Sequence, residues 1–119
     1  MLQKTDLANP VLHSHNFLSS MYADSYFPAA LVGEIENILL HLCRDIGRDR
    51  PQTLEAFCRN THSAVEKINA LQQRFEEQGS KIETVARDAI AADVDFIVRA
   101  YGLDTDEDGL EELLAPRKW

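Results

Sequence analysis

The sequence predicts an all-α fold, specifically an up-down helical bundle with three long helices and a shorter helix at each end. Apolar residues recur at spacings of three and four through most of the chain, which is the periodicity of an amphipathic helix. No segment alternates between polar and apolar residues over the length of a strand. The connections between the long periodic segments are short, and short loops make successive helices antiparallel neighbours.

One domain accounts for the whole chain. A length of 119 residues supports a single hydrophobic core. An apolar fraction of 45% with a charged fraction of 27% is typical of globular proteins. Residues 1–13 lack periodicity, so we expect a flexible arm there. Residues 14–119 are expected to form a single helical domain.

The first two predicted helices span residues 14–22 and 28–46. Pro28 suits the first turn of the second helix, where a backbone N–H is not needed, and Gly47 suits its C-terminal end. Their apolar stripes consist of Phe17, Leu18, Met21 and Tyr22 in the first helix and Leu31, Ile35, Ile38, Leu39, Leu42 and Ile46 in the second.

Two more long helices are predicted at residues 51–78 and 80–101, before a short helix at 110–114. The apolar stripe of the first continues for about seven turns and stops at a glycine. The second begins with a capping box, in which the side chains of Ser80 and Glu83 each bond an orphan backbone N–H.

The net charge of −8 is concentrated near the C-terminus. Residues 104–112 contain six acidic side chains, which leaves 14 of the 20 acidic residues against 12 basic residues elsewhere. A nucleic-acid partner is excluded, because binding phosphates requires a basic face. The acidic patch instead suits a basic protein partner or a cation.

The sequence predicts a cytoplasmic protein with no membrane partner. Its longest apolar runs fall far short of the ~20 residues needed to span a bilayer, and no secretory signal pattern follows Lys4. Cys43 and Cys58 are therefore expected to be reduced thiols. We expect no cofactor, because the chain lacks a glycine-rich phosphate loop, a nucleophile elbow and a zinc-protease helix motif. The same absences favour a protein that is not an enzyme.

Part of a calcium-loop pattern lies in the acidic segment. Asp104, Asp106 and Asp108 match its first, third and fifth positions, and Gly109 matches the sixth. The twelfth position is an alanine, so the bidentate glutamate that normally closes such a loop is absent. We regard the three aspartates as weak metal candidates. We favour an acidic helix N-terminus instead, with Thr105 or Asp106 as its cap.

The two cysteines lie almost symmetrically about the turn at residues 48–50. An antiparallel hairpin would therefore bring Cys43 and Cys58 to a similar height, and His62 is one helical turn beyond Cys58. These three residues could contribute zinc ligands, or the thiols could form a disulfide. Because the chain has no tight Cys-x-x-Cys pair, we favour buried, unreactive thiols.

Asp93 occupies a position where the stripe of helix 80–101 expects an apolar residue. A carboxylate facing the core needs a partner, because burying an unpaired charge is costly. The candidates are the hydroxyls of Tyr22 and Tyr26, the imidazole of His62, or an arginine. Asp93 is either a general base or ligand in a polar pocket, or it makes a structural hydrogen bond. We favour the structural role.

The loop between the first two predicted helices is rich in aromatic side chains. Tyr22, Tyr26 and Phe27, with Asp24 beside them, could form a recognition surface. They could equally form a hydrophobic cap over one end of the bundle, with Asp24 or Ser25 capping the next helix. The binding residues that we expect are Tyr22, Asp24, Tyr26, Phe27, Asp93 and His62.

Two segments resemble signatures of one bacterial protein family. Residues 21–28 read MYADSYFP and residues 82–90 read IETVARDAI, and both are similar to the small family known as the domain of unknown function number 5713. The C-terminal sequence RKW is similar to that family's basic-then-Trp terminus. The resemblance covers most of residues 17–119. It implies a soluble helical domain and no particular chemistry.

We expect a non-catalytic binding or protein-interaction module, which could be self-associating or of the immunity-protein type. In this interpretation the aromatic side chains supply buried contact area, and the acidic patch steers a basic partner. A homodimer is one form that a self-associating module of this kind could take. The alternative is a metal- or small-ligand-binding protein with a polar site around Asp93, His62 and a tyrosine.

Overall fold

The computed structural model describes residues 2–119, and every regular element among them is helical. The predicted all-α class is therefore confirmed for the described part of the chain. Met1 lies outside it. The elements are the 3-10 helices η1 (Lys4–Asp6) and η2 (Pro10–Leu12), followed by α1 (Ser19–Tyr22), α2 (Ala29–Asp49), α3 (Leu54–Asn69), α4 (Gln72–Glu77), α5 (Thr84–Ala100) and α6 (Glu107–Leu113).

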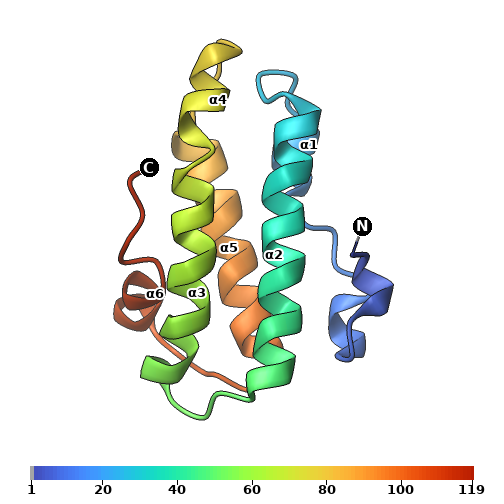
Figure 1. Cartoon of the computed structure of the whole chain (residues 1–119), viewed down its shortest axis with the longest axis vertical. Helices are drawn as coiled ribbons and strands as arrows, with labels where there is room; N and C mark the ends of the chain where they lie inside the picture. The colour runs from blue at the N-terminus through green and yellow to red at the C-terminus, as the bar shows by residue number, and fades with distance from the viewer. Residues whose placement is uncertain (1) are drawn as a thin grey trace.

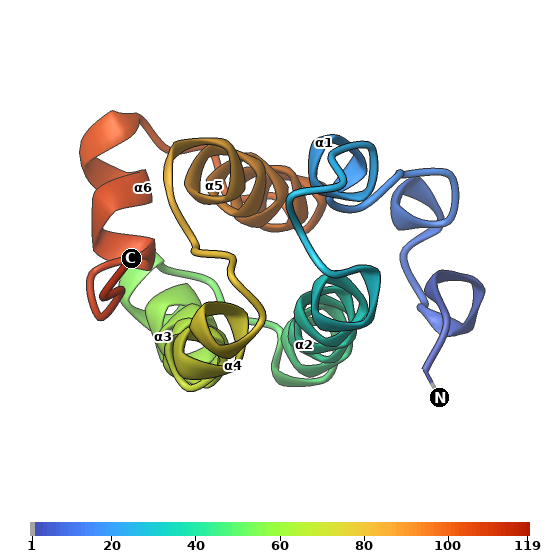
Figure 2. The ribbon, with the colours of Figure 1, turned by 90° about the horizontal axis from the view of Figure 1, so that it is seen from above.

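The long helices α2, α3 and α5 lie side by side along the long axis of the molecule (Figure 1). The chain runs in one direction through α2 and α5 and in the opposite direction through α3, and α4 extends the far end of α3. Figure 2 shows α1 and α5 in one layer and α2 and α3 in the other, with α6 at one edge and the 3-10 helices at the opposite edge. Short α1 packs on α5, and α6 packs on α3.

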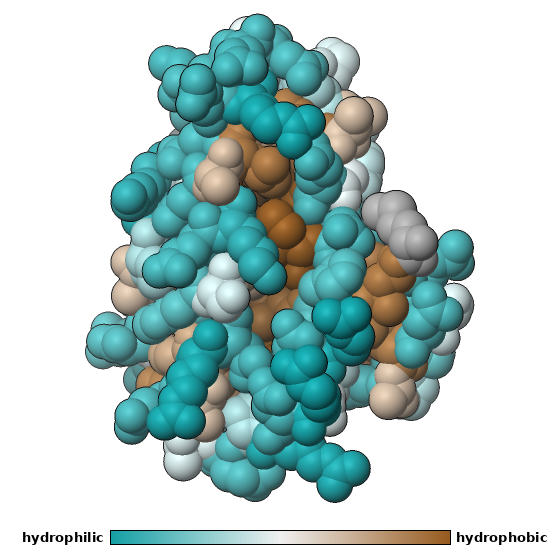
Figure 3. All heavy atoms as spheres, in the orientation of Figure 1, coloured by the Kyte–Doolittle hydropathy of each residue, from teal (hydrophilic) through white to brown (hydrophobic). Residues whose placement is uncertain are grey.

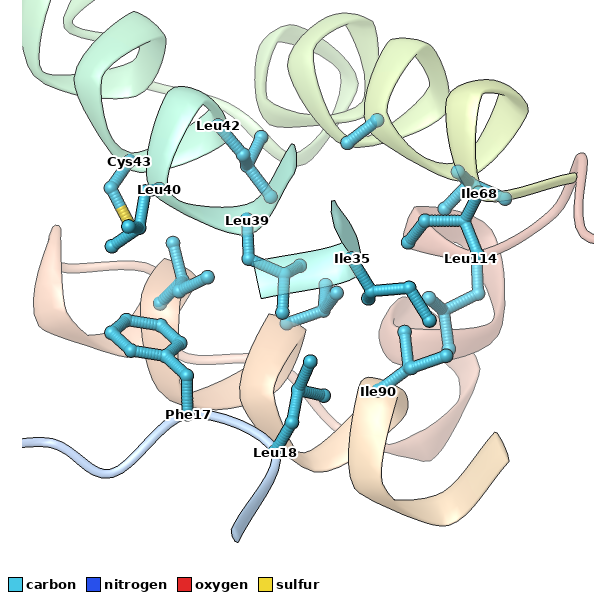
Figure 4. Close-up of a cluster of buried hydrophobic side chains, with 14 of the residues drawn as sticks. Phe17, Leu18, Ile35, Leu39, Leu40, Leu42, Cys43, Ile68, Ile90 and Leu114 are labelled. Atoms are coloured by element: carbon cyan, nitrogen blue, oxygen red, sulfur yellow. The ribbon is translucent and has the colours of Figure 1, made fainter. Parts of the chain in front are cut away.

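The core fills the space between these two layers. Figure 4 shows Ile35 and Leu39 of α2 facing Ile90 of α5 and Ile68 of α3, with Leu18 approaching from the N-terminal segment. Each fully buried side chain of this size contributes about 1.5–3 kcal/mol relative to exposure. The outer surface is mostly polar, although apolar residues show along the seam between α2 and α3 (Figure 3).

The segment before α1 differs from the flexible arm that we expected. Its 3-10 turns bury Leu7 and Leu12, which are 4% and 0% exposed. The side-chain amide of Asn9 donates to the carbonyl oxygen of Ala100 at 2.7 Å, which attaches the segment to the end of α5. Two apolar residues on separate short turns produce no helical periodicity, so the sequence does not reveal this packing.

The helix predicted at residues 51–78 is interrupted between α3 and α4. The N–H of Leu71 bonds the carbonyl of Ile68, a tighter 3-10 pattern that ends α3. At this break the side chain of Asn69 donates to the carbonyl of Pro116 at 2.9 Å and accepts from the N–H of Lys118 at 3.0 Å. The contact ties the C-terminal residues to the bend, and it depends on residues far away in the sequence.

The predicted capping box at Ser80 and Glu83 is wrong. Helix α5 begins at Thr84, and its N-cap Glu83 makes no side-chain capping bond. Ser80 instead completes a Schellman motif after α4: its N–H bonds the carbonyl of Phe75, and Gly79 adopts a φ of +74°. Ser80 therefore belongs to the C-terminal cap of α4, although the sequence pattern assigned it to the N-terminus of α5.

The helices of residues 2–119 are all too short or too polar to cross a membrane.

Replacing Ile97 with alanine tests the packing of α5 against the other layer. Ile97 is fully buried, so Ile97→Ala should lower the free energy of unfolding by about 2–5 kcal/mol. Val85 lies on the same helix and is 47% exposed, so Val85→Ala should change it by less than about 0.5 kcal/mol. Urea unfolding followed by circular dichroism measures both. Equal effects of the two substitutions would contradict the assigned orientation of α5.

Candidate binding site

The carboxylate of Asp93 is the centre of a buried polar cluster. Asp93 lies on α5 and is 6% exposed. Its Oδ1 lies 2.8 Å from Nε2 of His15, and its Oδ2 accepts from the backbone N–H of Leu18 at 2.7 Å. The partner is therefore His15, which was not among the candidates that we expected. Asp93 joins α5 to the segment that precedes α1.

Aromatic side chains hold the imidazole of His15 in place. The ring stacks on Phe96 of α5, with centroids 3.9 Å apart and an angle of 11° between the planes. Phe17 meets it edge-on at 4.7 Å. An ionised Asp93 can only accept a hydrogen bond, so Nε2 carries a proton and Nδ1 is left as the second nitrogen. Within residues 2–119, Nδ1 has no hydrogen-bond partner.

The other bond to Asp93 comes from a strained residue. Leu18 has a φ of +54°, in the left-handed region that favours glycine, and such a conformation costs about 1–3 kcal/mol in a non-glycine residue. Its side chain is buried in the core and its N–H is bound by Asp93, so both ends of the residue are held. The turn redirects the chain into α1.

Burial raises the pKa of Asp93, because a charged carboxylate is poorly solvated in this position. The hydrogen bonds from His15 and Leu18 oppose that rise, while the nearby charge of Glu36 adds to it. Desolvation is the larger effect, so the net direction is upward. The folded protein therefore holds the proton of Asp93 more tightly than the unfolded chain does.

A surface cleft of about 490 Å³ lies in front of this cluster, and we call it the His15 cleft. The ammonium of Lys4 donates to the backbone carbonyl of His15 at 3.0 Å. The hydroxyl of Tyr22 donates to Oε1 of Glu36 at 2.8 Å, and burial together with this carboxylate raises the pKa of Tyr22 to about 12. Its wall includes Lys4, His15, Phe17, Ser19, Tyr22 and Glu36.

A second cleft, of about 520 Å³, lies beside the turn between α2 and α3. Its wall includes Pro10, Ile46, Pro51 and Tyr101, and Arg50 is its one charged residue. Opposite charges, an imidazole and hydroxyl groups are together on the wall of the His15 cleft. The slightly smaller cleft is therefore the better candidate for a polar ligand.

The aromatic loop is divided between core and surface. Phe27 is 6% exposed and packs in the core, whereas Tyr22 and Tyr26 are 45% and 46% exposed. Asp24 accepts from the N–H of Tyr26 at 2.9 Å, which makes a tight turn. Of the four contact residues that we expected in this loop, Phe27 is buried, Asp24 is half-buried, and the two tyrosines are the most exposed.

His62 lies at the contact between α3 and α6 and not beside Asp93. Its Nε2 donates to the carbonyl oxygen of Glu112 at 2.6 Å, so it joins α3 to α6. Asp93 bonds His15 and Leu18 instead. The structure therefore does not connect His62 to Asp93, and a polar site that combines these two residues with a tyrosine loses its geometric basis.

The side chains of Asp104 and Asp106 already have partners within the protein. The guanidinium of Arg99 donates to Asp104 at 2.9 Å, and Asp106 caps α6 by accepting from the N–H of Gly109 at 3.0 Å. Asp108 lies in the first turn of α6, where a negative charge complements the helix dipole. No cluster of three or more histidine, cysteine or acidic residues that could hold a metal ion occurs among residues 2–119. The three aspartates have capping and ion-pairing roles.

Cys43 and Cys58 are both buried and form no disulfide. Burial raises the pKa of Cys43 to about 12 and also raises the pKa of Cys58. The thiolate, which is the reactive form, is therefore disfavoured at neutral pH.

His15 was missed because its partner is 78 residues away in the sequence. The one sequence signal near this cluster was Asp93 itself, at an apolar position of a helix. Nothing in the spacing of the four histidines distinguishes His15 as the partner.

A family model described as a family of unknown function (DUF5713) matches residues 11–119, which confirms the resemblance seen in MYADSYFP and IETVARDAI. No curated protein and no solved structure matches the chain.

Replacing Asp93 with asparagine tests the raised pKa of this carboxyl group. Asparagine keeps the size, and its one amide oxygen can still accept from the N–H of Leu18, but it has no charge to desolvate. At acidic pH the wild type should have a larger free energy of unfolding, relative to Asp93→Asn, than it has at neutral pH. This relative advantage should shrink as the pH rises from below 3.8 through the raised pKa of the folded state. Urea unfolding of both proteins across this range measures the difference. A relative advantage that increases with pH would show that the pKa of Asp93 is lowered instead.

Proposed function

Since the chain belongs to the family of unknown function DUF5713, we propose from its own geometry that it is a non-catalytic protein-interaction module. The observation that supports this is the pair Tyr22 and Tyr26, which expose nearly half of their surface from a firmly held loop. Tyrosine is enriched in the energetic centres of protein interfaces, because its large ring is buried while its hydroxyl keeps a polar partner.

The loop around these tyrosines is already ordered. Phe27 anchors it in the core, and the ring of Tyr26 meets Phe27 edge-on at 5.1 Å. The hydroxyl of Tyr22 is fixed on Glu36 of α2. Ordering a free side chain on binding costs about 0.5–1.5 kcal/mol. Because this loop is already ordered, a partner that binds it loses less of its binding free energy to this ordering. We call the two exposed rings the tyrosine surface.

The charge of the protein favours a basic partner. The net charge is −8, and Asp24 and Glu36 lie beside the tyrosine surface. Helix α6, whose sequence is rich in acidic residues, lies on the other side of the molecule from α1 in both ribbon views (Figures 1 and 2). The acidic segment thus contributes to long-range attraction of a basic protein, while the tyrosine surface supplies the direct contact.

The partner in this proposal is a basic protein in the cytoplasm, as for an immunity-type protein, or a second copy of the chain. The three long helices would serve as a rigid up-down scaffold, with the shorter helices presenting the contact residues. A self-associating form requires the tyrosine surface to pack against a copy of itself.

Replacing both tyrosines with alanine tests the proposal. A partner captured from the source cells is purified and its affinity measured by calorimetry. Tyr22→Ala with Tyr26→Ala should weaken binding by about 2 kcal/mol or more, because such rings act as hot spots. The matched control is Val11→Ala with Val85→Ala, two residues that are 53% and 47% exposed elsewhere. Sedimentation velocity of the wild type tests the self-associating form.

Unchanged affinity in the tyrosine variant would overturn the proposal, as would an equal loss in the valine control.

A further inference from the structure

The His15 cleft holds two opposite charges that do not neutralise each other. Lys4 comes from η1 and Glu36 from α2, and both line the cleft. No ion pair joins these two side chains in the described structure; the ammonium of Lys4 bonds a backbone carbonyl, and Glu36 accepts from a tyrosine hydroxyl. An ammonium has three N–H donors and a carboxylate has about four acceptor sites. Both groups therefore have bonding capacity left for a ligand.

We propose that the His15 cleft binds a small dipolar ligand that carries one carboxylate and one ammonium group, as a free α-amino acid does. The ligand carboxylate bonds the ammonium of Lys4 and the hydroxyl of Ser19. The ligand ammonium bonds the carboxylate of Glu36. The apolar part of the ligand lies against the half-exposed ring of Tyr22. A volume of about 490 Å³ is within the range of small-molecule sites.

The charges on the wall select against ligands with a single charge. An anion without an ammonium group would leave Glu36 without a charged partner and would be repelled by it. A cation without a carboxylate would leave Lys4 unpaired and would be repelled by it. A ligand with both groups satisfies both ends of the cleft. A singly charged ligand makes one of the two charge contacts and meets the other charge as a repulsion, so it should bind more weakly.

Asp93 and His15 act as positioning residues for Lys4. The ammonium of Lys4 is held by the backbone carbonyl of His15. That backbone is in turn fixed, because the imidazole is bonded to Asp93 at 2.8 Å and stacked on Phe96 at 3.9 Å. The buried cluster on α5 therefore sets where the positive end of the cleft lies. This site involves a small molecule and does not depend on the protein partner proposed above.

Calorimetric titration with three related probes tests the charge requirement. The probes are L-phenylalanine, 2-phenylethylamine, which lacks the carboxylate, and 3-phenylpropionate, which lacks the ammonium. The full chain should bind L-phenylalanine, or another of the standard amino acids titrated in parallel, with a dissociation constant below about 1 mM. The two singly charged analogues of the bound amino acid should bind at least about tenfold more weakly.

Charge-removing variants then identify the two ends of the cleft. Lys4→Met should weaken binding of the amino acid about tenfold or more and should abolish the discrimination against its amine analogue. Glu36→Gln keeps an acceptor for Tyr22, and it should abolish the discrimination against the carboxylate analogue. Lys81→Met and Glu83→Gln change exposed residues outside the cleft and should have no effect.

This crossed pattern separates ligand contact from a structural role, because a general loss of stability would weaken every probe alike. The proposal is overturned if none of the standard amino acids binds, or if a singly charged analogue binds as tightly as its parent. It is also overturned if the two variants weaken all three probes equally. None of these results bears on the tyrosine surface, whose test measures a protein partner.

Discussion

The N-terminal part of the molecule depends on the buried carboxylate of Asp93. Burying a charge costs several kcal/mol unless its bonds to water are replaced, and here both oxygens have a protein partner, His15 and the N–H of Leu18. Without the carboxylate, the partly exposed imidazole of His15 and the buried, strained N–H of Leu18 would both lose their partner. The packing of the segment before α1 on α5 therefore depends on a polar contact as well as on the burial of Leu7 and Leu12.

The same contact determines the shape of the surface. The left-handed turn at Leu18 leads the chain into α1, which carries Tyr22 toward Glu36 of α2. The fixed backbone of His15 accepts the ammonium of Lys4. Residues from η1, α1 and α2 are thereby brought to one cleft. The contact of Asp93 with His15 and Leu18 therefore stabilises the fold and also fixes the positions of the groups that line the cleft.

The long helices could be predicted because their apolar residues repeat over many turns, as in α2 and α5. The break after Asn69 could not, since the residue is ordinary in a helix and its role depends on the C-terminal residues. Asp93 could be singled out by its apolar position, but its partner is too distant in the sequence to be inferred. Composition likewise does not show that Phe27 is buried while Tyr22 and Tyr26 are exposed.

Hydrogen–deuterium exchange of Asp93→Ala against the wild type tests the central role of this carboxylate most directly. The account predicts that amides of residues 7–18 exchange at least about tenfold faster in the variant, while those of α3 keep their protection. Unchanged protection at residues 7–18 would show that apolar burial alone holds the segment. An equal loss of protection throughout α2, α3 and α5 would show that Asp93 supports the whole fold, and this too would contradict the account.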